Sequence, residues 1–328
     1  MTNIASQSAL LGHNVNVLAD GSKYYSSKFD RNQKFKIHRF DQLKFLRKKI
    51  KSNFAKNLIQ ENNFDIIFFD SWKSLEGFEE YKKIKKICLI HGNEILELNK
   101  LDRILSSLKK CKGVIFNSSY TQKLFFKNFK KLHKKKFKII YPAFIDSIKP
   151  ITIKKKYDLC TVARLEYRKG HHLVLESLYK LKINHKINLK YAILGNGPEL
   201  SRLKDLVMKF NLLKQVSFIE ENIKSSKIFS QSKIHIMPTI TTPNSIEGFG
   251  ISNVEAASFG LPCIVSESGG TQESINNNGK IIKENSLEDL TNAILDVLSN
   301  SSKLSKKSHQ FARKFQNVKK IKEYLNSF

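Results

Sequence analysis

A polar loop that contains a carboxylate and two glycines leads into an expected helix at residues 241–256. Glu247 lies in this loop beside Gly248 and Gly250, and Glu255 follows about one and a half turns inside the helix. Backbone N–H groups and the positive end of a helix suit a phosphate group or sugar hydroxyls. The two carboxylates can each accept hydrogen bonds from hydroxyls of a sugar or ribose. The residues alone leave a second interpretation open, a glycine turn followed by an ordinary glutamate on a helix face.

Cations gather in a second segment, residues 163–170, between an expected strand and an expected helix. Arg164 and Lys169 stand in this segment. In doubly wound α/β domains, ligands bind at the carboxyl ends of the strands. An arginine can hold phosphate oxygens with two N–H groups, while a lysine acts as a point charge. The segment therefore indicates an anion site.

A third strand-to-helix turn lies at residues 194–199 and contains Gly195, Asn196 and Gly197. Its glycines would let the backbone approach a ligand closely. Taken alone, it is only a tight turn.

The elements that must position these residues alternate between strand and helix patterns along the chain. Short apolar runs are typical of buried parallel strands, and amphipathic helical stretches lie between them. This alternation predicts an α/β fold of two doubly wound, parallel-sheet domains with a cleft between them. The expected strands lie at 15–18, 65–69, 87–90, 113–116, 159–162, 191–194, 216–219, 234–237 and 263–265, and the expected helices include 41–60, 170–183, 199–210, 225–231 and 250–259.

The stretch 142–156 holds two prolines and three consecutive lysines, as expected of a linker. We therefore expect an N-terminal domain over 1–150, a second domain over 151–305 and a helical segment over 306–328. Residues 1–11 look like the end of a helix, whereas a doubly wound domain begins with a strand and a turn. We expect that the first strand of the N-terminal domain is missing.

The composition excludes several classes of protein. With 41% hydrophobic and 27% charged residues among 328, the chain is neither disordered nor collagen-like. No apolar run approaches the roughly 20 residues that cross a bilayer, and no signal-peptide pattern is visible. The four cysteines are far apart without a CxxC pair, so we expect neither a metal site nor a disulfide framework, and a cytoplasmic protein.

The formal net charge of +29 has two interpretations. It could attract polyanions such as nucleic acid, an anionic membrane face or phosphorylated ligands. It could also reflect the lysine-rich usage of an AT-rich coding sequence. No zinc, RRM or KH signature is present, so nucleic-acid binding is not favoured.

Two segments of the first half combine lysines with apolar residues, at 41–60 and 123–136. An anionic leaflet attracts such clusters, which predicts reversible attachment at the inner face of the cell membrane. In the alternative interpretation, the apolar stripe of 41–60 packs on the first sheet and its lysines are solvated.

Together, these segments resemble the retaining, nucleotide-sugar-dependent glycosyltransferases of family four, the group 1 glycosyl transferases, which have the two-domain GT-B fold. The family's pattern of two glutamates separated by seven residues matches Glu247 and Glu255. Its arginine and lysine for the donor diphosphate match Arg164 and Lys169. Its Gly-x-Gly-Pro-Glu turn matches residues 195–199.

Further parts of the resemblance lie outside these segments. Residues 268–273 match the family's later Gly-Gly-x-x-Glu loop, and residues 116–121 match an Asn-Ser motif before a helix. His91 stands where the family carries an active-site histidine, although a lone histidine could simply pack in the core or on the surface. Asp70 and Trp72, after another expected strand, are acceptor-side candidates, and Asp70 could equally cap a helix.

The resemblance implies that the chain moves a hexosyl group from a UDP- or GDP-sugar to a saccharide or lipid-linked acceptor. The anomeric configuration would be retained, and no metal or other cofactor would be needed. The segment 306–328 would return to the first domain. The implied catalytic residues are His91, Glu247, Arg164 and Lys169, and the implied donor-binding residues are Gly195, Asn196, Gly197, Gly248, Phe249, Gly250, Ile251 and Glu255.

One departure keeps other functions open. The family's first strand and glycine-rich loop have no counterpart in this sequence before the helix at 1–11. The alternatives are a truncated or inactive GT-B protein, a different GT-B enzyme such as an epimerase or phosphorylase, and a basic nucleic-acid-binding protein.

Overall fold

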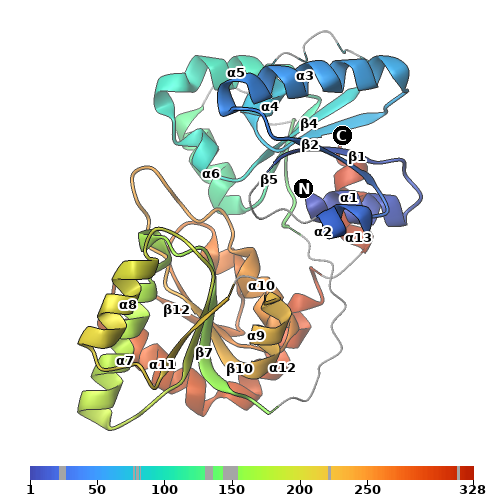
Figure 1. Cartoon of the computed structure of the whole chain (residues 1–328). Helices are drawn as coiled ribbons and strands as arrows, with labels where there is room; N and C mark the ends of the chain where they lie inside the picture. Colours follow the sequence, from blue (N-terminus) through green and yellow to red (C-terminus); the bar gives the residue numbers. More distant parts are fainter. Residues whose placement is uncertain are drawn as a thin grey trace. The chain divides into compact units, whose positions relative to one another are not determined.

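The chain forms two compact units in a computed structural model (Figure 1). Unit 1 comprises Met1–Asn117, Leu124–Ile145 and Asn317–Phe328, and unit 2 comprises Ser118–Lys123 and Asp146–Gln316. The division after residue 145 lies close to the expected one after 150, although most of the predicted linker, 143–153, lies outside the described residues. The structure describes residues 1–21, 27–76, 78, 81, 83–129, 136–142, 154–220, 223–315 and 318–328.

Unit 2 contains one sheet of six parallel strands in the order β12-β11-β10-β7-β8-β9. The order runs outward from β7 and β10 in both directions, which is the doubly wound topology that the sequence predicts. The chain order reverses between β7 and β10, where Leu159 pairs with Ile234. The strands are β7 Tyr157–Val162, β8 Tyr191–Leu194, β9 Val216–Ile219, β10 Ser232–Met237, β11 Cys263–Ser266 and β12 Gly279–Ile282.

Helices cover both faces of this sheet, as Figure 1 shows with α7, α8 and α11 on one side and α9, α10 and α12 on the other. Successive strand residues serve opposite cores: Leu159 packs with the first group and Cys160 with the second. This alternation explains why the strands are apolar throughout. The helical elements are η4 Tyr167–Lys169, α7 His171–His185, α8 Leu200–Lys209, α9 Ser225–Gln231, α10 Ile251–Ser258, η5 Thr271–Ser274, α11 Leu287–Ser299 and α12 Ser301–Ala312.

The described residues of unit 1 form two parallel sheets, one with the order β3-β4-β5-β6 and one of β1 and β2 alone. A helix, α1, precedes the first of these strands, in agreement with the sequence pattern at 1–11. The sequence predicts β1, β3, β4 and β5 but misses β2, where Lys36 and Arg39 interrupt the apolar residues, and the short β6. The strands are β1 Asn16–Asp20, β2 Lys36–Phe40, β3 Ile66–Phe69, β4 Lys85–Ile90, β5 Gly113–Phe116 and β6 Phe137–Ile139.

The core of unit 1 depends on a helix from the far end of the sequence. Ile321 and Tyr324 of α13 are buried against Ile87 and Ile115, and the Tyr324 hydroxyl donates a hydrogen bond to the Ile140 carbonyl at 3.1 Å. The helical elements of unit 1 and its boundary are α1 Thr2–Leu10, α2 Ser27–Arg31, α3 Lys44–Glu61, α4 Trp72–Leu75, η1 Asn93–Ile95, η2 Leu98–Lys100, α5 Leu101–Lys109, α6 Ser119–Asn128 and α13 Val318–Leu325.

The expected bounds of the returning segment, 306–328, were too wide. Helix α12 stays in unit 2, where it packs on α10. Phe311 and Phe315 form a ring cluster with Phe249, with centroids 5.0 and 5.9 Å from Phe315. Burial of these rings holds residues 306–315 on unit 2, and only α13 belongs to unit 1.

Candidate active site

The best-defined group of charged side chains in unit 2 lies where the strand order reverses. Strand β7 leads into η4, which carries Arg168 and Lys169, and the neighbouring strand β10 leads into the loop with Glu247. In doubly wound sheets, this reversal point is the usual position of a ligand site. The segments that the sequence singles out as an anion site and a carboxylate loop are therefore brought together.

Glu247 accepts hydrogen bonds from two cations through the same oxygen, Oε2. The Lys169 ammonium is one donor, and Nη1 of Arg168 is the other at 2.9 Å. The three side chains are 11–16% exposed. Burial by itself would raise the pKa of Glu247, but Lys169 and Arg168 outweigh it and hold the pKa below its ordinary value. The carboxylate is therefore ionised at neutral pH.

Arg168 is a site residue that the predicted set omits. Its Nε donates to Glu166 at 3.0 Å, so that its guanidinium bridges two carboxylates. Arg164, which the resemblance places at the diphosphate, pairs with Glu166 at 2.9 Å, and its side chain is 75% exposed. The sequence signal is a run of three cations within six residues, which does not reveal the two that meet Glu247.

The glycine turn at 195–199 packs against the loop of Arg164. At Gly195 (φ +152°), a Cβ atom would lie 1.9 Å from the carbonyl oxygen of Ala163. The Asn196 carbonyl accepts a hydrogen bond from the N–H of Leu165 at 2.9 Å. In the structure, the backbone of Gly195, Asn196 and Gly197 supports the neighbouring loop; that these residues also approach the donor stays a prediction.

The glycine pair at 269–270 fixes the main chain of Glu247. The N–H of Gly270 donates to the Glu247 carbonyl at 2.7 Å. At Gly269 (φ +61°), a Cβ atom would lie 2.2 Å from that same oxygen. This close approach explains why the loop at 268–273 requires glycine.

The remaining donor-site candidates lie around the start of α10. Gly248 and Gly250 are buried, Ile251 begins the helix, and Glu255 is half-buried within it. The side chain of Phe249 is 2% exposed and packs on Phe315, so the donor contact expected of this residue would come from its backbone and stays a prediction. Because a large apolar ring gains more from burial than from solvent, Phe249 anchors the loop to the core.

His91 is exposed at the end of β4 in unit 1. Its N–H donates to the carboxylate of Glu94, and its carbonyl accepts a hydrogen bond from the Asn117 amide at 3.1 Å. These contacts fix the backbone at the strand end and leave the imidazole at the surface. That His91 contacts the donor sugar stays a prediction.

The two acceptor-side candidates differ in the structure. Asp70 is exposed and accepts a hydrogen bond from the Ser74 hydroxyl at 2.6 Å. The prediction is wrong for Trp72, which is fully buried and donates its indole N–H to the Glu94 carbonyl at 2.9 Å. Trp72 is the first residue of α4, and it fills the core where an acceptor cannot reach it.

No group of three or more His, Cys, Asp or Glu side chains within the described ranges is arranged to hold a metal ion. No helix in the same part of the chain is long and apolar enough to cross a membrane.

The chain is similar to known proteins in both sequence and fold. Residues 144–316 match the family model of the group 1 glycosyl transferases. The chain is similar to the uncharacterized glycosyltransferase MJ1069 of Methanocaldococcus jannaschii, with 27% identity over 306 residues that cover 81% of this chain and 75% of that protein. It is also similar to the O-antigen biosynthesis glycosyltransferase WclY of Escherichia coli, with 36% identity over 104 residues. That match covers 32% of this chain and 27% of WclY, and the matches with the WcaL proteins of Salmonella typhimurium and Escherichia coli span about a third of their length.

The fold is that of the GT-B glycosyltransferases. The crystal structure of Anabaena HepE in complex with UDP and glucose has a TM-score of 0.78 with this chain at 16% identity, and the match covers 99% of this chain and 94% of HepE. The expected fold class is confirmed.

Proposed function

Because the chain belongs to the group 1 glycosyl transferases, we propose that it transfers a hexosyl group from a nucleoside-diphosphate sugar to an acceptor hydroxyl with retention of configuration. The observation that carries this proposal is the buried arrangement of Glu247, Lys169 and Arg168 at the reversal point of the unit 2 sheet.

The arrangement suits a reaction in which negative charge develops on a leaving diphosphate. Two cations already stand at the site, and the first turn of α10 presents N–H groups that have no acceptor within the helix. Groups fixed before the reaction stabilise the charge as it forms, which lowers the barrier rather than only tightening binding. When the donor binds, the cations would turn to the diphosphate, and Glu247 would accept hydrogen bonds from sugar hydroxyls.

The other residues of the site would bind the rest of the donor. Glu255 would bind the ribose, and the backbone from Gly248 to Ile251 would bind the donor phosphates. His91 would contact the donor sugar. The departing diphosphate would take the acceptor proton, so that neither a metal nor another cofactor takes part.

The names of similar proteins guide the choice of substrates. HepE was crystallised with UDP and glucose, and WclY is an O-antigen biosynthesis glycosyltransferase. We propose a UDP- or GDP-hexose as donor and a saccharide or lipid-linked glycan of the cell envelope as acceptor. Such an acceptor would place the enzyme in the cytoplasm, attached at the inner face of the membrane.

The donor can be identified by thermal shift, because a ligand that binds the native state raises its melting temperature. UDP, GDP and their hexose conjugates would be compared, and NMR of the product of the best donor would give its anomeric configuration. A shift with transfer and retention is expected. Epimerisation or phosphorolysis without transfer would contradict the proposal.

Variants of the charged group test the site itself. Glu247→Gln and Lys169→Met should each lower kcat by about 100-fold or more, since each removes a group that stabilises developing charge or holds the sugar. The control is Glu288→Gln on the exposed start of α11, which should keep wild-type turnover. Wild-type turnover in both site variants would refute the assignment.

The family resemblance assigns the donor diphosphate to Arg164, whereas the structure places Arg168 beside Glu247. Variants of the two arginines distinguish these assignments. Both would be changed to Met and compared for kcat. A larger loss in Arg168→Met is expected from its contact with Glu247. A loss confined to Arg164→Met would mean that the exposed arginine turns inward to bind the donor.

A further inference from the structure

Helix α3 of unit 1 leaves most of its apolar residues in solvent. Five of the fifteen exposed large hydrophobic side chains in the described part of the chain belong to α3 or its N-cap. No residue of α3 is buried. The alternative in which the whole stripe packs on a sheet is therefore wrong for the first half of the helix. The exposed residues, which we call the α3 surface, are Leu43 (67%), Phe45 (75%), Leu46 (44%), Ile50 (38%) and Phe54 (37%).

The apolar contacts of α3 with the rest of unit 1 come from its second half. Ala55 and Ile59 pack against the core around Trp72. The Phe54 ring also touches those of His38 and Phe40, with centroid distances of 4.8 and 5.5 Å. The first half of α3 is held to unit 1 by ion pairs of Arg47, Lys48 and Lys51, and its apolar side chains Phe45 and Leu46 remain exposed.

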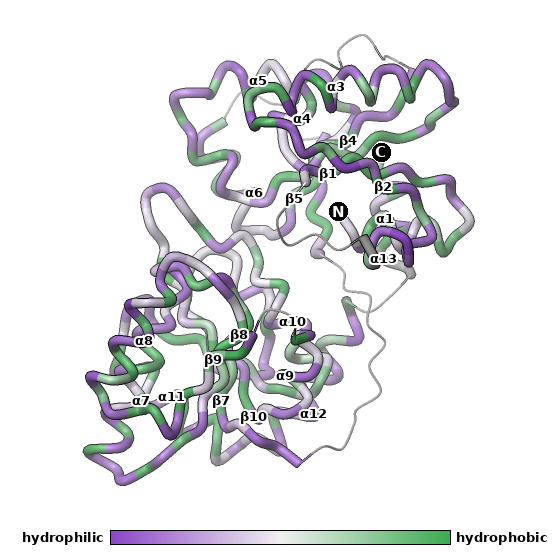
Figure 2. Tube along the Cα trace, in the orientation of Figure 1, coloured by the Kyte–Doolittle hydropathy of each residue, from purple (hydrophilic) through white to green (hydrophobic). Residues whose placement is uncertain are grey.

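The same helix carries a strong excess of positive charge. Its acidic residue is Glu61, in the last turn, against the six cations Lys44, Arg47, Lys48, Lys49, Lys51 and Lys56. Acids of neighbouring elements neutralise part of this charge: Asp20 pairs with Arg47 and Lys51, and Glu76 pairs with Lys48. Within the described ranges, neither Lys44 nor Lys49 forms an ion pair, and both are exposed. Figure 2 shows the resulting mixture of hydrophobic and hydrophilic residues along α3.

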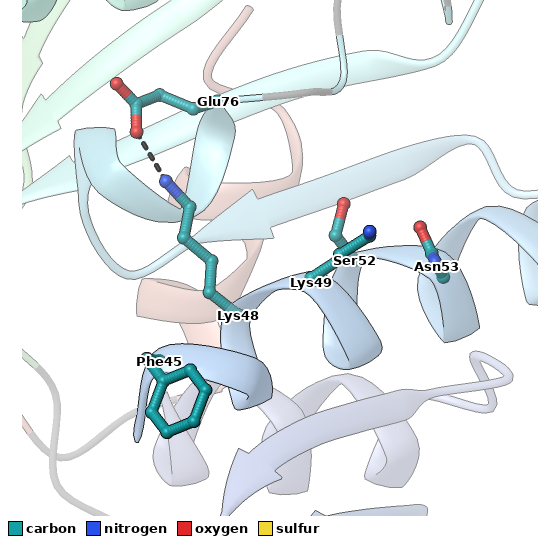
Figure 3. Close-up of a pocket in the computed structure, with 6 residues that line it drawn as sticks. All are labelled: Phe45, Lys48, Lys49, Ser52, Asn53 and Glu76. Atoms are coloured by element: carbon teal, nitrogen blue, oxygen red, sulfur yellow. Dashed lines mark hydrogen bonds and ion pairs between the residues drawn. The ribbon is translucent and has the colours of Figure 1, made fainter. Parts of the chain in front are cut away.

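A shallow pocket lies on this helix (Figure 3). It has a volume of about 280 Å³, and Lys48 reaches from it to Glu76 at one wall. Its lining combines an aromatic ring, two ammonium groups, small polar side chains and the Glu76 carboxylate. Because Glu76 already pairs with Lys48, Lys49 is the ammonium group left to meet a lipid phosphate. The lining residues are Phe45, Lys48, Lys49, Ser52, Asn53 and Glu76.

We propose that unit 1 docks on an anionic lipid surface through the α3 surface. Phe45 and Leu43 enter the headgroup layer, and Lys44 and Lys49 contact lipid phosphates. Exposed apolar side chains next to exposed cations let a surface contact both the phosphates and the upper acyl carbons of an anionic leaflet. The proposal deepens the proposed function, since it names the element that holds the enzyme where a lipid-linked acceptor lies.

The positive charge of α3 favours an anionic lipid surface over a second copy of the chain as its partner. Two copies that met through α3 would bring two basic helices together, and the repulsion would oppose the contact. A leaflet rich in anionic lipids offers the opposite charge over a wide area. The second predicted basic segment, 123–136, does not enter this argument because residues 130–135 lie outside the described residues.

The test measures binding of the full chain to vesicles by sedimentation, without nucleotide sugar. Vesicles of phosphatidylcholine alone would be compared with vesicles that also contain phosphatidylglycerol. We expect binding only to the anionic vesicles, and its loss when salt is raised from about 0.05 to about 0.5 M. Equal binding to both kinds of vesicle would overturn the electrostatic part, and no binding at low salt would overturn the proposal.

Variants locate the docking element. Lys44→Glu with Lys49→Glu should weaken binding at least about tenfold, whereas Lys303→Glu with Lys307→Glu changes the net charge equally on α12 of unit 2 and should have little effect. Phe45→Ser should also weaken binding, and its control is Leu213→Ser, which removes an apolar side chain of unit 2 with a similar exposure of 67%. If the two charge-reversal pairs weakened binding equally, only the total charge of the protein would act. That result, or equal effects of Phe45→Ser and Leu213→Ser, would overturn the assignment to α3.

The remaining outcomes are also informative. Concentration-dependent dimerisation that Phe45→Ser abolishes would replace the lipid by a second copy. Because the assay contains no donor or acceptor, its result is independent of the transfer assay. Vesicle binding without transfer would refute the proposed function alone, and transfer to a soluble acceptor without vesicle binding would refute the docking alone.

Discussion

Two buried histidines of unit 2 predict that the protein loses stability in mild acid. Burial lowers the pKa of His171 and that of His235 from 6.5 to about 3, with the charge of Lys169 adding to the effect. In the unfolded chain, both take up a proton as the pH falls below 6.5, whereas in the folded state they do so only near pH 3. Their contribution to stability is therefore complete above pH 6.5 and decreases as the pH falls toward 3.

The size of the effect follows from the difference in pKa. At pH 5, about 1.5 pH units below the ordinary histidine pKa, each of the two residues lowers the free energy of unfolding by about 2 kcal/mol, and the pair lowers it by about 4 kcal/mol. This is a large part of the 5–15 kcal/mol by which a protein is usually stable. Urea unfolding followed by circular dichroism at pH 8 and pH 5 would measure the loss. Trp72 is the single tryptophan and lies in unit 1, so its fluorescence reports that unit separately.

The variant His171→Leu keeps the buried volume but cannot titrate. It should therefore lose only about half as much stability between pH 8 and pH 5 as the wild type. His185→Leu, at the exposed end of the same helix, is the control and should lose as much as the wild type. The reasoning is refuted if His171→Leu shows the full acid loss, or if acid shifts only the Trp72 signal. His235→Leu provides the same test should His171→Leu not fold.

Three further predictions concern the backbone, the last helix and metals. Gly269→Ala should lower kcat about tenfold or more, because its Cβ would displace the Glu247 carbonyl; Gly12→Ala, where φ is also positive but nothing lies within 4 Å, should not. A chain that stops at Phe315 lacks α13, with the buried Ile321 and Tyr324, and should lose about 5 kcal/mol or more of unit 1 stability, measured by Trp72 fluorescence in urea; an unchanged midpoint would contradict this. Treatment with EDTA should leave transfer unchanged, and a loss that Mg²⁺ restores would show that the protein cations do not suffice.

Much of unit 2 could be predicted because its strands are buried on both faces and therefore continuously apolar. The helix at 225–231 was predicted with its observed bounds. Strand β12 was missed because it lies at the sheet edge, where Lys280 and Ile281 are exposed and the apolar pattern is weak. An edge strand tolerates more polar residues than a central strand, since one side of it lacks a neighbouring strand.

The site could be predicted only in part from the sequence. The motif identified Glu247 and Lys169, but spacing cannot tell which arginine near Lys169 turns inward. That choice depends on the 3₁₀ turn at Tyr167–Lys169, which directs Arg168 and Lys169 to one carboxylate. The glycines at 195 and 197 are ambiguous for a similar reason, because a close approach to another loop and a close approach to a ligand require the same residue.

The position of α13 has a consequence for how the protein is made. Unit 2 is nearly continuous in sequence, from 146 to 316, and its two cores can form as soon as that stretch has been synthesised. Unit 1 leaves the ribosome before unit 2, yet Ile321 and Tyr324, which complete the part of its core around Ile87 and Ile115, follow unit 2 in the sequence. While unit 2 is being translated, α13 is not yet available, and the apolar surface around Ile87 and Ile115 stays exposed. The first unit to be synthesised is thus the last to be finished, and during that interval chaperones have a site to bind.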